Sequence, residues 1–303
     1  MLAIVIPYYK IEFFEECLAS LAMQTNDRFN VYIGNDQSPD NPKELIASYS
    51  KHLNIVYKEF DENLGMVSLT QQWERCLALV QEEEWISLLG DDDILGENCV
   101  MEFYKLLEEG KTRFFNVLRF SSQVINAKGE EISRIYTHPE QENSKDFIFR
   151  KLMGYTRSSL SEYIFRKENM CGFHGFPLAW HSDEMALLEF SNFGTILTFQ
   201  KGLVKFRNSS LNITSRYDNL IQKNTASFSF FYLLLYIYHQ KFSKEQNSLF
   251  LERLEKAYLN DKKNKLFFIN YLKIALKRRN PILVWDFLGK FGKSIYLKQK
   301  SSS

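Results

Sequence analysis

Three adjacent carboxylates, Asp91, Asp92 and Asp93, are the residues of this chain with the clearest capacity for chemistry. Carboxylates held side by side repel one another and are driven toward protonation unless a cation offsets their charge. Mg²⁺ and Mn²⁺ suit such a run, because they bind through one or two carboxylates and complete their shells with water and phosphate oxygens. The run follows an apolar segment, which favours a metal site over the alternative of a solvated turn with a helix-capping aspartate.

The hydrophobic pattern of the first 110 residues predicts the elements that position this run. Short apolar runs indicate strands at 3–6, 29–33, 54–57 and 85–89. Helical spacing of apolar residues indicates helices at 12–23, 42–50, 67–80 and 97–109. Alternation of strands and helices at this spacing is typical of a parallel α/β sheet with right-handed crossovers.

A polar cluster follows each of these four strands. The clusters are Pro7-Tyr8-Tyr9, Asp36, Asn63-Leu64-Gly65 and the acidic run 91–93. Ligands of open parallel sheets bind beyond the carboxyl ends of the strands. We therefore expect the four clusters to meet at one edge of the sheet, around a bound ligand.

The pattern changes after residue 110. Residues 113–120 and 131–136 predict two strands joined by a turn at 126–129. Residues 160–207 mix strands with one helix near 183–190, and residues 217–297 have a helical pattern. The chain is therefore expected to form an α/β domain over 1–215 and a mainly helical region over 216–303.

Charge is distributed unevenly along the chain, although the formal net charge is only +1. Residues 241–303 hold 15 Lys and Arg against 5 Asp and Glu, whereas residues 1–240 hold 23 against 32. The segment 270–298 interleaves basic and aromatic residues, which suits a helix lying on an anionic membrane surface. A helical cap with solvated basic residues is the alternative, and no nucleic-acid partner is expected because no recognised module accompanies the charge.

Cysteine usage and hydropathy bear on location. Cys17, Cys76, Cys99 and Cys171 form no CxxC motif, and no signal peptide precedes them, so they are expected to be buried thiols in a reducing compartment. The longest apolar stretch, near 228–238, is too short to span a bilayer. A cytoplasmic protein is expected, at most peripheral on the inner face of the cell membrane.

Five motifs, taken in order over residues 1–215, resemble those of family 2 glycosyltransferases with the GT-A fold. They are IVIPYY at 4–9, QT at 24–25, GNDQS at 34–38, NLG at 63–65 and LLGDDDIL at 88–95. The resemblance implies a Rossmann-like, mostly parallel central sheet with flanking helices and a C-terminal helical extension. It also implies inverting transfer of a sugar from a nucleoside-diphosphate sugar, UDP-linked by analogy with the family, in bacterial cell-surface polysaccharide or glycolipid assembly.

The resemblance assigns roles to the residues of the donor site. Pro7 and Tyr9 would pack against the nucleotide base, Asp36 would read the base or ribose, and the motif containing Asn63 and Gly65 would bind the donor. In the acidic run, Asp91 is expected toward the ribose and metal, Asp92 as principal ligand of Mn²⁺ or Mg²⁺, and Asp93 in either position.

A helix start supplies the expected catalytic base. The resemblance assigns acceptor deprotonation to Asp183, with Glu184 as the second choice; helix capping is the alternative for this acidic start. His181 is a further candidate base or ligand, or else a first-turn residue. The acceptor would be a saccharide or lipid-linked saccharide.

Departures from the family pattern keep two other functions open. Lys10 stands where the family usually has Asn, and Gly90 where it usually has Asp. A sugar-nucleotide nucleotidyltransferase shares the fold and metal, but residues 7–11 lack the Gly-rich phosphate loop of that class. A non-catalytic module that binds a nucleotide sugar is the other alternative.

Overall fold

The structure, a computed structural model, describes residues 1–209, 219–278 and Gly289. Contacts divide the chain into two compact units: Met1–Gly175 with Ser182–Arg216, and Phe176–His181 with Tyr217–Ser303. The expected boundary between residues 215 and 216 lies outside the described residues. Residues 176–181, which the sequence-based division assigned to the first domain, have their contacts in the second unit.

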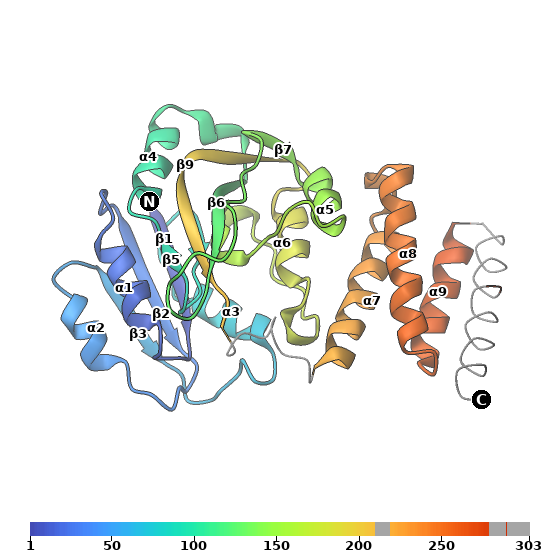
Figure 1. The fold of residues 1–303 in the computed structure, drawn as a ribbon, viewed down its shortest axis with the longest axis horizontal. Coiled ribbons are helices and arrows are strands. Elements are labelled where there is room, and N and C mark those ends of the chain that lie inside the picture. Colours follow the sequence, from blue (N-terminus) through green and yellow to red (C-terminus); the bar gives the residue numbers. More distant parts are fainter. Residues whose placement is uncertain (210–218, 279–288, 290–303) are drawn as a thin grey trace. The chain divides into compact units, whose positions relative to one another are not determined.

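The first half of the sheet is parallel and alternates with helices (Figure 1). Its strands are β1 (Leu2–Tyr8), β2 (Phe29–Asn35), β3 (Ile55–Glu59) and β4 (Trp85–Leu88), in the spatial order β3-β2-β1-β4. The intervening helices are α1 (Phe14–Ala22), α2 (Lys43–Tyr49) and α3 (Leu69–Leu77), and α4 (Cys99–Glu108) follows the acidic run. The predicted parallel α/β arrangement is confirmed.

Both faces of β1 are buried, which explains its continuous apolar sequence. Successive side chains of a strand point to opposite faces. Leu2, Ile4 and Ile6 pack in the core that includes residues of α1, α2 and α4, whereas Ala3 and Val5 pack in the core that includes Cys76 of α3. Each large apolar side chain buried in this way contributes about 1.5–3 kcal/mol. The two helical layers thus fix the direction of β1 and the position of its carboxyl end.

The second half of the sheet is mixed. Its strands are β5 (Ile94–Leu95), β6 (Val117–Ile125), β7 (Gln141–Asn143), β8 (Tyr163–Arg166) and β9 (Thr195–Arg207). The order continues β4-β8-β6-β9-β5; β8 runs antiparallel to β4 and β6, β6 and β9 are parallel, and β5 and β7 are antiparallel to β9. The expected α/β fold class is confirmed, with the parallel strands concentrated at the N-terminal end.

Two local predictions differ from the structure. The strand expected at 113–120 begins only at Val117, because residues 111–114 form a 3₁₀ turn after Gly110, whose φ of 69° ends α4. The expected partner strand at 131–136 makes only two isolated bridges, at Glu131 and Tyr136.

Two helices complete the first unit, α5 (Ser144–Leu152) and α6 (Ser182–Phe190). Only α6 was expected from the sequence. The side chain of Asn143 accepts a hydrogen bond from the amide of Lys145, so α5 carries an N-cap that a sequence reading could have used. Short 3₁₀ segments lie at Lys111–Phe114, Leu160–Glu162, Lys167–Asn169, Pro177–Ala179 and His239–Lys241.

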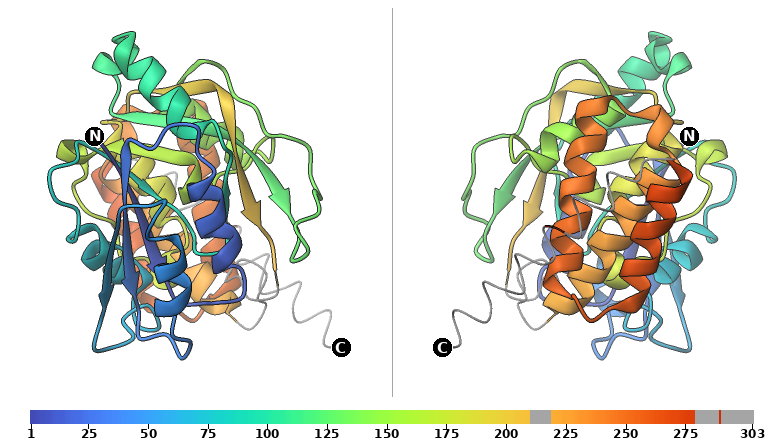
Figure 2. Two further views of the ribbon diagram at one scale, coloured as in Figure 1. Left: turned by 90° about the vertical axis from the view of Figure 1, so that its left-hand side faces the viewer. Right: turned by 90° about the vertical axis from the view of Figure 1, so that its right-hand side faces the viewer.

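Three helices form most of the described second unit: α7 (Leu220–Tyr236), α8 (Lys244–Asn260) and α9 (Lys265–Lys277). Figure 2 shows them side by side. A capping box of Ser243 and Gln246 starts α8, and Phe228 of α7 stacks on Phe267 of α9 with ring centroids 3.8 Å apart. The helical pattern is confirmed for these residues; the rest of the segment 270–298 lies outside the described residues except Gly289.

Candidate active site

The carboxyl ends of β1, β2 and β4 meet at one edge of the sheet, and Tyr9 joins them. The amide of Tyr9 donates to Oδ2 of Asp91 at 2.8 Å, and its carbonyl accepts a 2.7 Å hydrogen bond from the hydroxyl of Ser38. The amide of Lys10 donates to the same Asp91 oxygen at 2.9 Å. The polar segments after these three strands therefore converge, as their positions in the sequence predict.

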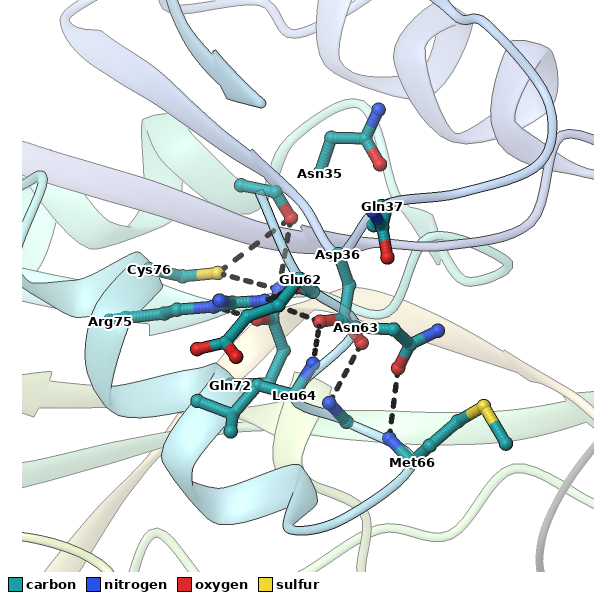
Figure 3. A network of polar contacts seen from close by, with 12 residues as sticks. Asn35, Asp36, Gln37, Glu62, Asn63, Leu64, Met66, Gln72, Arg75 and Cys76 are labelled. Carbon is teal, nitrogen blue, oxygen red and sulfur yellow. Dashed lines mark hydrogen bonds and ion pairs between the residues drawn. The ribbon is translucent and has the colours of Figure 1, made fainter. Parts of the chain in front are cut away.

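Asp36 anchors the loop that follows β3 (Figure 3). Its buried carboxylate accepts hydrogen bonds from the amides of Leu64 at 2.7 Å and Gly65 at 2.9 Å, and it forms an ion pair with Arg75 of α3. Burial raises the pKa of Asp36, and the two amides and Arg75 oppose that rise. The remaining polar cluster, residues 63–65, is thus brought to the same edge by Asp36.

Close packing explains Gly65. A Cβ at this position would lie 2.4 Å from Oδ2 of Asp36, so the loop approaches the carboxylate only where no side chain intervenes. Asn63 stabilises the same turn, because its Oδ1 accepts a hydrogen bond from the amide of Met66 at 3.0 Å. In this structure Asp36, Asn63 and Gly65 are used to build the edge; their direct contact with a donor stays a prediction.

The two residues expected to pack against the nucleotide base are accessible. Tyr9 has 37% of its surface exposed, and Pro7 is half-buried. An exposed aromatic ring offers a planar apolar face to which a nucleobase can bind. The sequence-based role of Pro7 and Tyr9 is therefore compatible with their accessibility.

The three aspartates of the acidic run have different hydrogen-bond partners. Asp91 accepts from the amides of Tyr9 and Lys10, and Asp93 accepts from the hydroxyl of Ser161 and from the amide of Arg207. Within the described part of the chain, the Asp92 carboxylate accepts a hydrogen bond only from its own amide. The flanking aspartates hold the run in place, and Asp92 is left with capacity for a ligand.

Electrostatics at the run favour a cation. Burial, and then the charge of Asp92, raise the pKa of Asp91 to about 6 and that of Asp93 to about 7. Burial also raises the pKa of Asp92, while the charges of Lys10 and Arg207 oppose that rise. Over residues 1–209 and 219–278, no three His, Cys, Asp or Glu side chains are grouped to hold a metal ion by themselves.

Arg207, at the end of β9, contacts the acidic run, and it was not among the site residues predicted from the sequence. Its side chain is fully buried; Nε donates to the carbonyl of Asp92 at 2.9 Å, and Nη2 donates to Glu16 at 2.6 Å. Ser161 was missed as well. The available signal for Arg207 was a basic residue ending a late strand, which specifies no partner.

The start of α6 distinguishes its two acidic residues. Glu184 is 2% exposed and forms an ion pair with Lys151 of α5, whereas Asp183 is only partly buried. Burial raises the pKa of Asp183, and the charges of Lys151 and Arg157 oppose that rise. Asp183 is thus the less buried of the two residues, and its role as catalytic base stays a prediction.

Arg157 relates this helix start to the acidic run. Its Nη1 donates to Glu162 at 2.7 Å and to Ser122 at 3.0 Å. The positive charge of the same guanidinium lowers the pKa of both Asp93 and Asp183 against the effect of burial. Asp93 and Asp183 thus both lie within electrostatic range of one half-buried guanidinium, which was not predicted from the sequence.

His181, the other candidate base, makes packing contacts. His181 belongs to the second unit, where it hydrogen-bonds the hydroxyl of Ser227 and stacks on Phe230 at 4.6 Å. These contacts give His181 a packing role within its unit.

The cysteines were expected to be buried thiols. Cys17, Cys76 and Cys99 are buried, but Cys171 is exposed, so the prediction was wrong for Cys171.

Comparisons with known proteins bear on the family of the chain. The family model of glycosyl transferase family 2 matches residues 3–164, more than half of the chain. Glycosyltransferase GlyG of Streptococcus pneumoniae serotype 4 is 26% identical over 110 residues, which make up 36% of this chain and 36% of GlyG. The aligned segment thus spans about a third of that relative's length.

Solved structures of S. aureus TarS have a similar fold. The complex of TarS 1–349 with UDP-GlcNAc matches with a TM-score of 0.64 and 16% identity, covering 97% of this chain and 81% of that one. The complex with UDP gives a TM-score of 0.54 and 15% identity, with coverage of 92% and 89%. This likeness shows the fold, and the family model assigns the sequence: the chain belongs to glycosyl transferase family 2.

Proposed function

We propose that the protein transfers a sugar from a nucleoside-diphosphate sugar to an acceptor hydroxyl with inversion at the anomeric carbon. The observation that carries the proposal is the convergence of Tyr9, the Asp36-anchored loop and the acidic run at one edge of the sheet. The UDP-GlcNAc and UDP bound to TarS support a UDP-linked donor.

The donor would bind with its base against Tyr9 and Pro7 and its diphosphate toward Asp92. Tyr9 contributes an exposed aromatic face, and Asp92 contributes a carboxylate whose only hydrogen-bond donor in the described chain is its own amide. Asp36 would shape the base pocket by holding residues 63–65 in place. Direct recognition of the base by Asp36 would require one of the carboxylate oxygens to accept a further hydrogen bond, from the base.

A divalent cation fits this arrangement. Mn²⁺ or Mg²⁺ would be held by Asp92, with Asp91 or Asp93 as a second carboxylate and phosphate oxygens of the donor in the other positions. Such an ion supplies Lewis-acid neutralisation of the charge on the leaving diphosphate. The raised pKa values of Asp91 and Asp93 support this assignment, because burial and then the charge of Asp92 disfavour their ionised forms, which a bound cation would favour.

Asp183 would act as general base toward the acceptor hydroxyl. Asp183 is less buried than Glu184, and the charges of Lys151 and Arg157 favour its ionised form against burial. A positioned general base typically contributes a factor of about 10²–10⁴ in rate. Glu184 is a poorer candidate, because Lys151 neutralises it in a buried ion pair.

Donor binding and turnover test the proposal separately. Purified protein is combined with UDP, GDP, UDP-GlcNAc and other sugar nucleotides, with and without Mn²⁺, and its melting temperature is recorded. A ligand that binds only the folded state raises that temperature. We expect a metal-dependent rise with a UDP-sugar, and absence of any nucleotide effect would contradict the proposal.

Turnover is followed as UDP release with saccharide acceptors. Asp92→Asn and Asp183→Asn should each lose at least about 10²-fold in rate, with donor binding retained in Asp183→Asn. Glu44→Gln, which alters an exposed carboxylate on α2, is the control. Wild-type rates in either site variant would reject its assigned role, and donor binding without turnover on any acceptor would identify a binding module.

The acceptor class extends the proposal further. We propose a saccharide or lipid-linked saccharide acceptor, in cell-surface polysaccharide or glycolipid assembly, and a cytoplasmic location. The described helices include none that is both long and apolar enough to cross a membrane. A nucleotidyltransferase is disfavoured, because Pro7–Ile11 contains no glycine with which to surround a phosphate.

A further inference from the structure

The solvent-facing side of α9 is unusually apolar. Leu266, Ile269 and Leu276 have exposed fractions of 60%, 48% and 77%. With Lys265 and Lys273 they occupy an arc of about 100° at 3.6 residues per turn. We call these five residues the α9 outer face.

The opposite side of α9 is already used. Phe267, Tyr271 and Ile274 are buried; Phe267 stacks on Phe228 of α7, and the hydroxyl of Tyr271 donates to Glu255 of α8. An ordinary surface helix has one apolar and one polar side. Because α9 has apolar residues on both sides, packing against the described residues of the second unit does not account for its outer face.

Charge indicates what the outer face can bind. Residues 262–278 contain six Lys and Arg and no Asp or Glu, and no acidic residue occurs before Asp286. Lys265 and Lys273 are exposed beside the leucines and the isoleucine. A surface that combines apolar side chains with basic groups is complementary to an anionic phospholipid interface, into which the apolar groups insert while the basic groups remain at the headgroups.

The same charge disfavours two other occupants. A second copy of this face would oppose lysine with lysine. The residues that follow in the chain, 279–303, contain five Lys and Arg and one Asp, so their net charge is of the same sign as that of the face. We propose that the α9 outer face is a peripheral binding site for anionic phospholipid membranes. The proposal does not depend on the donor or acceptor chemistry.

Vesicle co-sedimentation of the full chain tests this proposal. Vesicles rich in phosphatidylglycerol are compared with pure phosphatidylcholine vesicles at low and high salt. We expect binding to the anionic vesicles that weakens with salt, since salt screens exposed charges. Equal binding to both vesicle types, or binding to neither, would overturn the proposal.

Three variants locate the contact. Leu266→Ser/Ile269→Ser/Leu276→Ser and Lys265→Gln/Lys273→Gln should each reduce anionic vesicle binding at least several-fold at unchanged melting temperature. Lys244→Gln/Lys256→Gln makes the same charge change at exposed positions of α8 and should bind like wild type. Unchanged vesicle binding in the serine variant would overturn the proposal.

Two further measurements separate the alternatives. A large fall in melting temperature of the serine variant would show that protein covers the face, and a wild-type dimer that dissociates in this variant would show a second copy; either result contradicts the proposal. UDP release with a soluble acceptor should be equal in all variants. Loss of vesicle binding therefore remains distinguishable from failure of the proposed transferase activity.

Discussion

The amide of Tyr9 and the carboxylate of Asp91, 82 positions apart in sequence, are joined by a hydrogen bond of 2.8 Å. The contact fixes the turn after β1 against the acidic run after β4. Tyr9, expected beside the nucleotide base, and Asp92, the expected metal ligand, are therefore held in position relative to each other. A second amide, from Lys10, donates to the same oxygen.

Replacement of Asp91 should therefore affect both stability and donor binding. Asp91→Ala leaves the amides of Tyr9 and Lys10 without their acceptor, at a cost of about 1–3 kcal/mol for an unsatisfied buried group. Asp91→Asn retains an acceptor oxygen and removes one negative charge, so its loss should be smaller. Urea denaturation measures the difference; equal stability of wild type and Asp91→Ala would contradict the role given to this contact.

Gly65→Ala should weaken donor binding through the loop. The new Cβ would meet Oδ2 of Asp36 at 2.4 Å, so the loop or the carboxylate must shift. Overpacking of this kind typically costs about 1–3 kcal/mol. Gly175→Ala is the matched control, because its Cβ would have Thr70 at 3.6 Å as its nearest neighbour. Equal donor affinity and stability in the two variants would show that the close approach at Gly65 is unimportant.

His138 should make stability depend on pH in acid. Burial, and then the charges of Arg119, Arg150 and Arg157, lower its pKa to about 3, whereas an unfolded histidine titrates near 6.5. Below pH 6.5 the unfolded chain takes up a proton that the folded chain does not, so this contribution to stability is lost as pH falls toward 3. The slope reaches at most about 1.4 kcal/mol per pH unit.

His138→Gln removes that titration. Unfolding free energies of the variant and of wild type, measured from pH 7.5 to pH 5, should converge as the pH falls, because only wild type loses the histidine contribution. In wild type, Nη2 of Arg150 donates a hydrogen bond to Nδ1 of His138, and the side-chain oxygen of Gln can accept that bond in the variant. A constant difference between the two proteins across this range would disprove the assignment.

Lys151 should act on turnover through the start of α6. Lys151→Met leaves the buried Glu184 carboxylate without its counter-charge, and breaking a buried pair typically costs about 3–5 kcal/mol. It also removes the largest of the charges that oppose the raised pKa of Asp183, so the acidic limb of the rate profile should move to higher pH.

The double variant Lys151→Met/Glu184→Gln separates these effects. Neutralising Glu184 should restore most of the stability, since no unpaired buried charge remains, but the displaced pH–rate profile should persist because Asp183 still lacks Lys151. Recovery of both properties together would mean that Lys151 serves only the structure.

The parallel half of the fold and the location of the site could be predicted from sequence. Strand–helix alternation specifies a parallel sheet, and carboxyl ends of parallel strands lie at one edge, so residues such as Tyr9, Asp36 and Asp91 could be brought together without coordinates. The roles within the edge could not be predicted in the same way. The Asp36 side chain accepts hydrogen bonds from the amides of Leu64 and Gly65, which lie 28 and 29 positions later in the sequence. No local sequence pattern specifies hydrogen-bond partners at that distance.

The mixed half was harder to predict for a related reason. Short strands such as Gln141–Asn143 are stabilised by pairing with β9, whose matching residues lie more than 50 positions later in the sequence. The strand expected at 131–136 has a suitable local pattern, but its residues make only isolated bridges. Tertiary pairing decides both cases, and hydrophobic periodicity does not contain that information.

Arg207 has a consequence for the order in which the molecule matures. The acidic run is synthesised 115 residues before the guanidinium that holds the carbonyl of Asp92, and that guanidinium is delivered by the last strand of the sheet. In a chain that ends before β9, the three aspartates would have neither the amide nor the side chain of Arg207. Competence for nucleotide sugars would therefore require the last strand in chain order, and chains interrupted before that strand would be inert.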